Sequence, residues 1–224
     1  MKSTDYRSNI TELVFILDRS GSMGGLESDT IGGFNSMLEK QKKTVGKTLV
    51  STILFDHESL VLHDRIPLAN VRPMTADDYI PRGSTALFDA VGDAIRHIGN
   101  IHKYARREDV PAKTLFVITT DGMENASHRY DRAEVRRMIE RQTKRFGWEF
   151  LFLGANIDAA ETAESIGIRG DCAVDFIADA DGTQKNYAAV SEAVSQIRAC
   201  APLGQAWRSE IDRDYQKRKG SARR

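Results

Sequence analysis

Runs of apolar residues alternate along the chain with segments in which apolar residues recur at helical spacing. The run at residues 13–17 has the length of a strand and no polar interruption, which predicts a strand buried on both faces of a sheet. Similar patterns predict further strands at residues 48–55, 60–68, 113–120, 148–153 and 172–176. Helical spacing of apolar residues predicts helices at residues 28–42, 83–104, 131–146, 159–165 and 183–199.

This alternation of strands and helices predicts an α/β fold, a doubly wound, mostly parallel six-stranded sheet with helices on both faces. Only the segment from Asp56 to Ser59 separates the second and third strands, so these two should form an antiparallel hairpin at one edge. We expect the strand order 3-2-1-4-5-6, in which the first and fourth strands are neighbours where the winding reverses. Residues 1–10 are expected to be a polar lead-in, residues 11–200 the folded domain, and residues 201–224 a C-terminal extension with a basic tail.

Composition and charge narrow the classes of function. The 224 residues include 32 Lys and Arg against 32 Asp and Glu, so the charge balance gives no reason to expect nucleic acid or an anionic membrane as a partner. No apolar run is long enough to span a bilayer and no secretory signal is visible, so we expect a cytoplasmic protein. Cys172 and Cys200 have no pairing motif and are expected to be free thiols. The sequence indicates no oligomeric state.

Two of the predicted strands end on a carboxylate. Asp18 follows the first strand, with Ser20 and Ser22 at the next alternate positions, and Asp121 ends the fourth strand. In open α/β sheets, ligands bind at the carboxyl ends of the strands where the order reverses, so both carboxylates should reach one crevice. Asp and Ser oxygens are hard ligands that suit a small divalent cation. Residues 18–22 alone could equally form a turn that terminates a strand, and the second carboxylate is what favours a ligand site.

Five residues in three segments resemble the metal-ion-dependent adhesion site of von Willebrand factor type A domains. The segment D-R-S-G-S supplies Asp18, Ser20 and Ser22, which match the first element of that site. The segment R-G-S-T-A-L supplies Thr85, which matches the second element, and the segment T-D-G supplies Asp121, which matches the third. The five positions occur in the order of the family, each at a predicted strand end or helix start.

The resemblance covers about residues 11–176, and residues 29–35, D-T-I-G-G-F-N, are similar to stand-alone prokaryotic members of the family. It implies that the three hydroxyls bind a metal directly and that the two carboxylates act largely through bound water. Mg²⁺, which takes octahedral oxygen ligation, is the expected ion, with Mn²⁺ or Ca²⁺ as substitutes. In the family, an Asp or Glu carboxylate of a partner protein fills the open metal position. The resemblance therefore implies a metal-dependent protein–protein interaction module and no enzymatic activity. The expected rim of the site is Arg19, Met23, Met123, Glu124 and Asn125.

The alternative is a metal-dependent phosphohydrolase of a doubly wound fold, with Asp18 as the nucleophile. The haloacid-dehalogenase pattern requires a second Asp two residues after the first to serve as acid and base, and Ser20 occupies that position. No other residue is an evident proton donor, so the sequence favours the interaction module.

Three further signals receive structural interpretations. The segment D-A-D-G at residues 179–182 is similar to part of a calcium-binding loop, but carboxylates are missing from its first and twelfth positions, so we expect Asp181 to cap a helix. The five histidines show no metal-ligand spacing and are expected at the surface. A solvated basic tail is expected from Lys217, Arg218, Lys219, Arg223 and Arg224.

Overall fold

The structure is a computed structural model that describes residues 9–221. Its sheet contains the strands β1 (Ile10–Asp18), β2 (Lys47–Phe55), β3 (Ser59–Pro67), β4 (Lys113–Thr120), β5 (Glu149–Ala155) and β6 (Ala173–Phe176). Their order is β3-β2-β1-β4-β5-β6, with β3 antiparallel to β2 and every other neighbouring pair parallel. The predicted sheet, its strand order and its antiparallel edge strand are confirmed.

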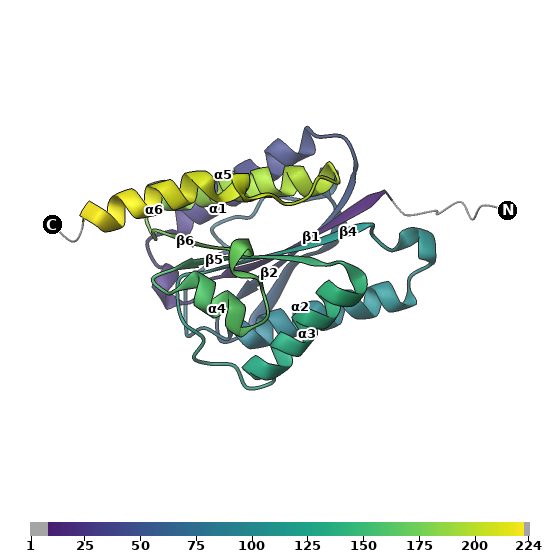
Figure 1. Ribbon diagram of the computed structural model, residues 1–224, viewed down its shortest axis with the longest axis horizontal. Helices are drawn as coiled ribbons and strands as arrows, with labels where there is room; N and C mark the ends of the chain where they lie inside the picture. Colours follow the sequence, from purple (N-terminus) through teal and green to yellow (C-terminus); the bar gives the residue numbers. More distant parts are fainter. Residues whose placement is uncertain (1–8, 222–224) are drawn as a thin grey trace.

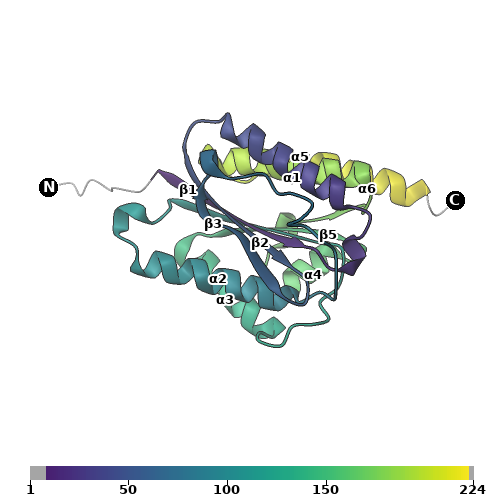
Figure 2. The same cartoon turned by 180° about the vertical axis from the view of Figure 1, so that it is seen from behind.

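Helices cover both faces of this sheet (Figure 1, Figure 2). They are α1 (Glu27–Lys42), α2 (Leu87–Tyr104), α3 (Arg132–Phe146), α4 (Ala159–Ser165), α5 (Ala180–Arg198) and α6 (Ser209–Ser221). The helices α1, α5 and α6 lie on one face, and α2, α3 and α4 lie on the other. Every helix predicted from the sequence is present, and α6 is an additional one.

The packing of β1 explains why its sequence is apolar without interruption. Leu13, Phe15 and Leu17 belong to the core on the side of α1 and α5, while Val14 and Ile16 belong to the core on the side of α2 and α3. All five side chains are at most 1% exposed. Because apolar burial stabilises by about 25 cal/mol per Å², a strand buried on both faces is strongly fixed in place. The carboxyl end of β1 is thereby held rigidly at the edge of the sheet.

The start of α2 differs from the prediction because loop hydrogen bonds compete with the helix. The helix begins at Leu87 and not at Gly83, which has a left-handed φ of 64°. The Thr85 carbonyl accepts from the amides of Asn125 and Ala126, and the Asp89 amide, which would bond that carbonyl in a helix, donates to Ser127 Oγ at 3.1 Å. Thr85 therefore belongs to the loop before α2.

The N-cap of α5 is also different from the prediction. It is Asp179, whose side chain accepts a hydrogen bond from the Gly182 amide at 2.8 Å. The expected cap, Asp181, forms an ion pair with Lys185 at 2.6 Å instead. By contrast, Asp131 caps α3 as expected and completes a capping box with Glu134.

The chain after α5 forms a further helix, whereas the helix at residues 183–199 was the last one predicted from the sequence. A short 3-10 turn, Gln205–Arg208, leads into α6. Trp207 and Ile211 are each 2% exposed and pack into the core beneath α5. This core extends past residue 200, and the boundaries given above for the lead-in, domain and extension remain predictions.

The prediction of a solvated basic tail is wrong for Arg218. Its guanidinium donates to Asp179 at 2.5 Å and forms an ion pair with Asp214, so α6 is held to the start of α5. Arg223 and Arg224 lie outside the described residues, as does most of the lead-in.

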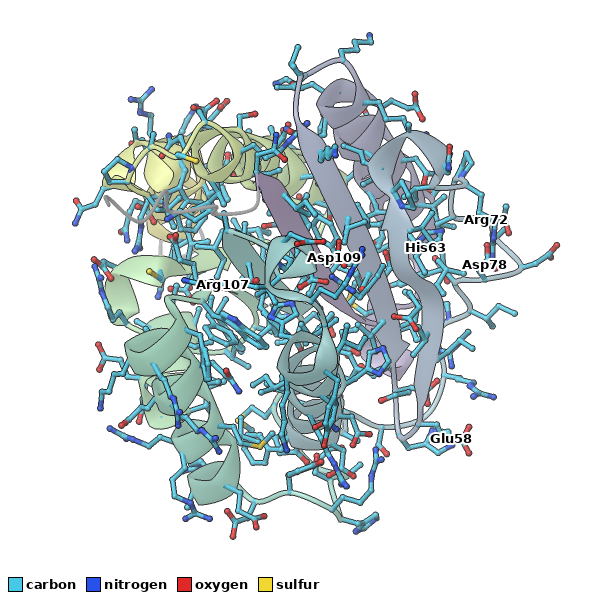
Figure 3. The ribbon with its side chains drawn as sticks, turned by 90° about the vertical axis from the view of Figure 1, so that its right-hand side faces the viewer. Glu58, His63, Arg72, Asp78, Arg107 and Asp109 are labelled. Carbon is cyan, nitrogen blue, oxygen red and sulfur yellow. The ribbon has the colours of Figure 1, made fainter. Side chains whose placement is uncertain are left out.

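Two of the histidines are not at the surface. His63 on β3 is 4% exposed, with Nδ1 3.0 Å from Thr52 Oγ1 (Figure 3). Burial, with a contribution from the charge of Arg72, lowers the pKa of His63. His102 on α2 has its Nε2 2.5 Å from the buried carboxylate of Glu12. His63 bonds a partner on the adjacent strand and His102 bonds one 90 residues away, and the absence of metal-ligand spacing reveals neither contact.

Cys172 and Cys200 are both free thiols, as expected. Within the described part of the chain, none of the helices combines the length and the apolar character that a bilayer span requires.

Candidate metal centre

The loop between β1 and α1 gathers three candidate oxygens at the carboxyl end of β1. The Ser20 amide donates to Asp18 Oδ1 at 2.7 Å, which folds the loop back over the strand end. The hydroxyls of Ser20 and Ser22 lie 3.1 Å apart, and Ser22 Oγ donates to Asp121 Oδ1 at 2.5 Å. The carboxylates from β1 and β4 thus meet across the serine hydroxyls, as the predicted strand order requires.

Thr120 is a second connection between the two strand ends, and it was not among the sequence candidates. The parallel register of β1 and β4 pairs Leu17 with Thr119, which brings the next residues beside each other. Thr120 Oγ1 donates to Asp18 Oδ2 at 2.5 Å. The position of Thr120 directly before the carboxylate of Asp121 was the available signal. Tyr79 Oη also donates to the Asp18 backbone carbonyl, a contact with no signal in the sequence.

Thr85 reaches the same place from the loop before α2. An added Cβ on Gly122 would lie 3.5 Å from Thr85 Oγ1 and 3.6 Å from Ser22 Oγ, so both hydroxyls face one point. The Asn125 amide donates to the Thr85 carbonyl at 3.0 Å, in return for the bond from the Thr85 amide to the Asn125 side chain. The structure therefore brings all five candidate residues together from three loops.

The two carboxylates are buried without a basic partner. Asp18 is 1% exposed and Asp121 is 4% exposed, and within residues 9–221 neither forms an ion pair. Burial raises the pKa of Asp18, although hydrogen bonds from Thr120 and Ser20 act in the opposite direction. Burial likewise raises the pKa of Asp121, opposed by the bond from Ser22. Carboxylates in such surroundings are stabilised by a cation, and the neighbouring hydroxyls are ligands that Mg²⁺ accepts.

Asp56 holds the loops of this site in position. It is fully buried at the end of β2, and its Oδ2 accepts a hydrogen bond from Arg82 Nε at 2.9 Å. Arg19 Nε lies 3.0 Å from the same oxygen as an ion pair without linear hydrogen-bond geometry. The Asp56 carbonyl accepts from the Ala86 amide at 2.8 Å, and the Arg82 amide donates to the Arg19 carbonyl at 2.9 Å. One buried carboxylate thus connects the loops that carry Ser20 and Thr85.

The segment Asp56-His57-Glu58 places three potential metal ligands within 4.8 Å of one another. Both oxygens of Asp56 already have partners, because Oδ1 accepts from the Glu58 amide at 2.8 Å and Oδ2 faces the two guanidinium groups. A cation here would have to displace Arg19 and Arg82. This cluster is therefore better explained as a structural anchor than as a metal site.

The expected rim residues have different roles. Arg19 and Met23 are buried, Arg19 against Asp56 and Met23 in the hydrophobic core, so neither forms the rim. Asn125 bonds the backbone of Thr85, and Glu124 accepts one hydrogen bond from the Phe88 amide at the start of α2. Met123 is 73% exposed and is available for contacts with a partner.

Asp89 fixes the segment that follows Asp121. Its carboxylate accepts from the backbone amides of His128, Arg129 and Tyr130 at 3.0, 2.9 and 2.9 Å. Burial alone would raise the pKa of Asp89, but these three donors and the charge of Arg129 outweigh it and hold the pKa below its usual value.

We expect Asp89→Asn to lower the free energy of unfolding by about 1–3 kcal/mol at neutral pH, because a charged hydrogen-bond acceptor is lost. The native pKa is depressed, so this contribution is present above the ordinary value of 3.8 and is lost as the pH falls below it toward the native pKa. Urea denaturation of both proteins at about pH 7 and about pH 3 measures the difference. An equal difference in the free energy of unfolding between the two proteins at both pH values would contradict this role of Asp89.

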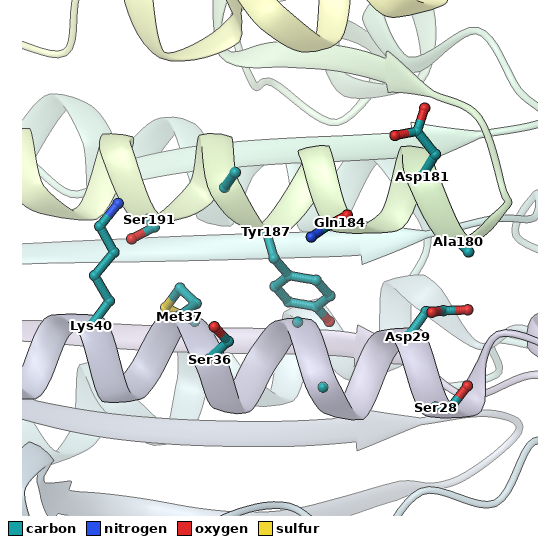
Figure 4. Close-up of a pocket in the computed structure, with 13 residues that line it drawn as sticks. Ser28, Asp29, Ser36, Met37, Lys40, Ala180, Asp181, Gln184, Tyr187 and Ser191 are labelled. Atoms are coloured by element: carbon teal, nitrogen blue, oxygen red, sulfur yellow. The ribbon is translucent and has the colours of Figure 1, made fainter.

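A groove of about 790 Å³ runs between α1 and α5, away from the candidate oxygens (Figure 4). Tyr187 points from α5 toward α1, and an added Cβ on Gly33 would come within 2.4 Å of its ring. Gly33 is therefore required for close packing of the two helices. None of the five candidate metal residues lines this groove.

Comparisons with known proteins give structural matches only. No protein-family model and no curated protein sequence matches the chain. Among solved structures, a mutant of the PilB minor pilin from Streptococcus sanguinis is 12% identical, with a TM-score of 0.60 over 84% of this chain and 62% of that one. A von Willebrand factor type A protein from Catenulispora acidiphila is 14% identical, with a TM-score of 0.57 over 83% of this chain and 42% of that one.

Proximal thread matrix protein 1 from the mussel byssus, in a structure with a zinc-occupied MIDAS motif, is 17% identical. Its TM-score is 0.54 over 84% of this chain and 46% of that one. The chain thus spans between 42% and 62% of the length of these three solved chains. These similarities show that the chain has the fold of von Willebrand factor type A domains.

Proposed function

We propose that Asp18, Ser20, Ser22, Thr85 and Asp121 hold one divalent cation, and that this cation binds an acidic side chain of a partner protein. The observation that carries the proposal is the meeting of two buried carboxylates, without a basic partner in the described chain, with three hydroxyls from two loops. Mg²⁺ is the proposed ion, with Mn²⁺ or Ca²⁺ as substitutes, since all five side chains offer hard oxygens. The zinc in the mussel protein's motif supports a cation at this position of the fold.

The hydroxyl and carboxylate residues would have different roles at such a site. The hydroxyls of Ser20, Ser22 and Thr85 are neutral, so they would leave most of the positive charge of the ion available to another ligand. Asp18 is held by Thr120 and the Ser20 amide, which fixes the orientation of its carboxylate. The bound ion would supply a Lewis-acidic position that an anionic oxygen of another protein can occupy.

A single carboxylate suits this position better than a polyphosphate. Arg19 and Arg129, on the segments that follow Asp18 and Asp121, are both engaged, Arg19 by Asp56 and Arg129 by Asp89 and Asp93. A polyphosphate would require free cationic groups to balance its additional charges. One Asp or Glu side chain on an exposed loop of the partner requires only the metal.

The phosphohydrolase alternative is not favoured, because Ser20 stands where the acid–base carboxylate would be needed. We therefore propose an interaction module without enzymatic activity. Hydrolysis of a panel of phosphate esters that requires Mg²⁺ and is abolished in Asp18→Asn would overturn this choice. The free thiols Cys172 and Cys200 support a reducing compartment, and we propose the cytoplasm.

The role of Thr85 is tested by removal of its hydroxyl. Thr85→Ala should retain the fold, since its backbone contacts with Asn125 do not involve the side chain. Metal-dependent binding of the partner should fall at least about tenfold, as one ligand of the ion is lost. Thr143→Ala, at an exposed position on α3, is the matched control and should bind as wild type does. Equal affinity of Thr85→Ala and the control would remove Thr85 from the site.

The role of a partner carboxylate is tested on the partner itself, once a metal-dependent pull-down with wild type and Asp18→Ala as baits has identified it. Neutralisation of one acidic residue by Asp→Asn or Glu→Gln should reduce affinity as much as a chelator does, because the metal and that carboxylate form one contact. If every single acid-to-amide change leaves affinity intact, the ligand is not a carboxylate, even where the metal site is real.

A further inference from the structure

A second candidate binding surface lies at the opposite end of the sheet from the metal centre. It is a groove of about 730 Å³ between the C-terminal halves of α2 and α3, and we call it the α2–α3 groove. Val110 and Pro111, which precede β4, and Trp148, which precedes β5, line it. The length of β4 places the α2–α3 groove about 25 Å from Asp121. Figure 3 views the molecule from this end, with Arg107 and Asp109 of the turn before β4 labelled.

The walls of the α2–α3 groove carry four exposed cations and no acidic side chain. Arg96 and Lys103 come from α2, and Arg141 and Arg145 come from α3. None of the four forms an ion pair with a carboxylate among residues 9–221. The chain has equal numbers of acidic and basic residues, so an unbalanced group of this kind is a local property.

Other basic residues of α3 are balanced by a carboxylate. On α3, Arg136 and Lys144 form ion pairs with Glu140 at 3.0 and 2.9 Å. Lys103 and Arg145 lie in the last turns of their helices, where a basic residue stabilises the helix dipole. Arg96 and Arg141 lie before the last turns, so the helix dipole does not account for them. Their positions on facing walls would suit an anionic ligand between the helices.

The base of the groove combines apolar side chains with His102 and Gln142. Trp148 is 4% exposed and stacks on Phe116, with ring centroids 5.2 Å apart, while Phe146 is 55% exposed at the edge. A Cβ on Gly99 would lie 3.9 Å from the Trp148 ring and 3.5 Å from Gln142, so glycine at this position leaves the base open without being required for packing. A concave surface that is partly apolar and lies between charged walls is typical of sites that receive a partly apolar ligand.

We propose that the α2–α3 groove binds an acidic amphipathic segment of a partner protein. Arg96 and Lys103 are seven residues apart on α2, which separates them by about 10 Å along the helix axis. This spread suits several carboxylates along one segment, with apolar side chains over Trp148, as in helix-in-groove recognition. A compact phosphate group fits less well, because the groove lies at the carbonyl ends of α2 and α3, where the helix dipoles disfavour concentrated negative charge.

The test uses fluorescence anisotropy with an array of labelled helical peptides of about 16 residues, each with an apolar face flanked by glutamates. Each peptide has a counterpart in which every glutamate is glutamine. At least one acidic peptide should bind the wild-type protein, and its glutamine counterpart should bind at least about tenfold more weakly. Binding should be unaffected by a chelator, which separates this site from the proposed metal centre.

Two variants remove the groove by different means. Arg141→Glu combined with Arg145→Glu reverses the charge of one wall, and Gly99→Leu fills the base without a change of charge. Each should weaken the acidic peptide at least about tenfold. The combined variant Arg136→Glu and Lys144→Glu makes the same charge change on the paired face of α3 and should bind normally. Circular dichroism spectra confirm that each variant is folded.

Three results would overturn the proposal. The first is that no acidic peptide of the array binds, and the second is that binding persists in both groove variants. The third is displacement of the peptide by ATP or inorganic phosphate at a concentration below the peptide's own Kd, which would assign the groove to a small phosphorylated ligand.

Discussion

Asp56→Ala is expected to lower the free energy of unfolding by about 3–5 kcal/mol, because it leaves a buried guanidinium without its partner. Arg19 is 7% exposed and has its Nε 3.0 Å from the Asp56 carboxylate, while Arg82 donates to the same oxygen. Loss of this carboxylate also separates the loops that carry Ser20 and Thr85. Metal affinity should therefore fall together with stability, although Asp56 is not a proposed ligand.

The matched control is Asp64→Ala on the neighbouring strand β3. Asp64 pairs with His97 at 2.9 Å, but both side chains are about half exposed, so the expected cost is below about 1 kcal/mol. Urea denaturation followed by circular dichroism measures both variants. If Asp56→Ala costs no more than Asp64→Ala, the buried cluster does not hold the loops together.

The second large effect is stabilisation by the metal itself. A cation that binds only the folded protein stabilises it by about 2.7 kcal/mol at a concentration one hundred times its Kd. For a domain of this size, we expect Mg²⁺ to raise the Tm by roughly 5–10 °C relative to the protein in chelator. The physical cause is the neutralisation of Asp18 and Asp121, which are buried without a basic partner in the described chain.

Asp121→Ala should remove most of this response, because one of the two carboxylates is gone. Asp77→Ala, at an exposed position with no ion pair in the described chain, should respond to Mg²⁺ as wild type does. Scanning calorimetry of the three proteins with Mg²⁺ and with chelator gives the comparison. A wild-type Tm that is the same in both buffers would contradict a folded-state cation site.

The sequence predicts the fold well where burial determines the pattern of apolar residues. The run from Leu13 to Leu17 has to be apolar throughout, because alternate side chains enter the cores on opposite faces of the sheet. The topology then predicted that Asp18 and Asp121 would meet, although they are far apart in the chain. The hydrogen bond from Ser22 to Asp121 at 2.5 Å is the structural outcome of that prediction.

The parts that sequence reasoning missed depend on single long-range contacts. The helix α6 carries one deeply buried apolar residue, Ile211, and the other anchor, Trp207, precedes the helix, so no helical periodicity is visible. Tyr79 bonds the Asp18 carbonyl across 61 residues, and Thr120 bonds the Asp18 side chain across 102 residues. A polar side chain that bonds a distant partner produces no local sequence pattern. Asp56 is a further example, because its partner Arg82 is 26 residues away.

The most direct test of the account is the location of a bound cation in crystals grown with Mn²⁺, by anomalous scattering at the manganese edge. The proposal predicts one peak among the oxygens of Ser20, Ser22 and Thr85, close to Asp18 and Asp121, and its loss in Asp121→Ala. No peak at that position, or a peak beside Asp56, His57 and Glu58 instead, would contradict the proposed metal centre.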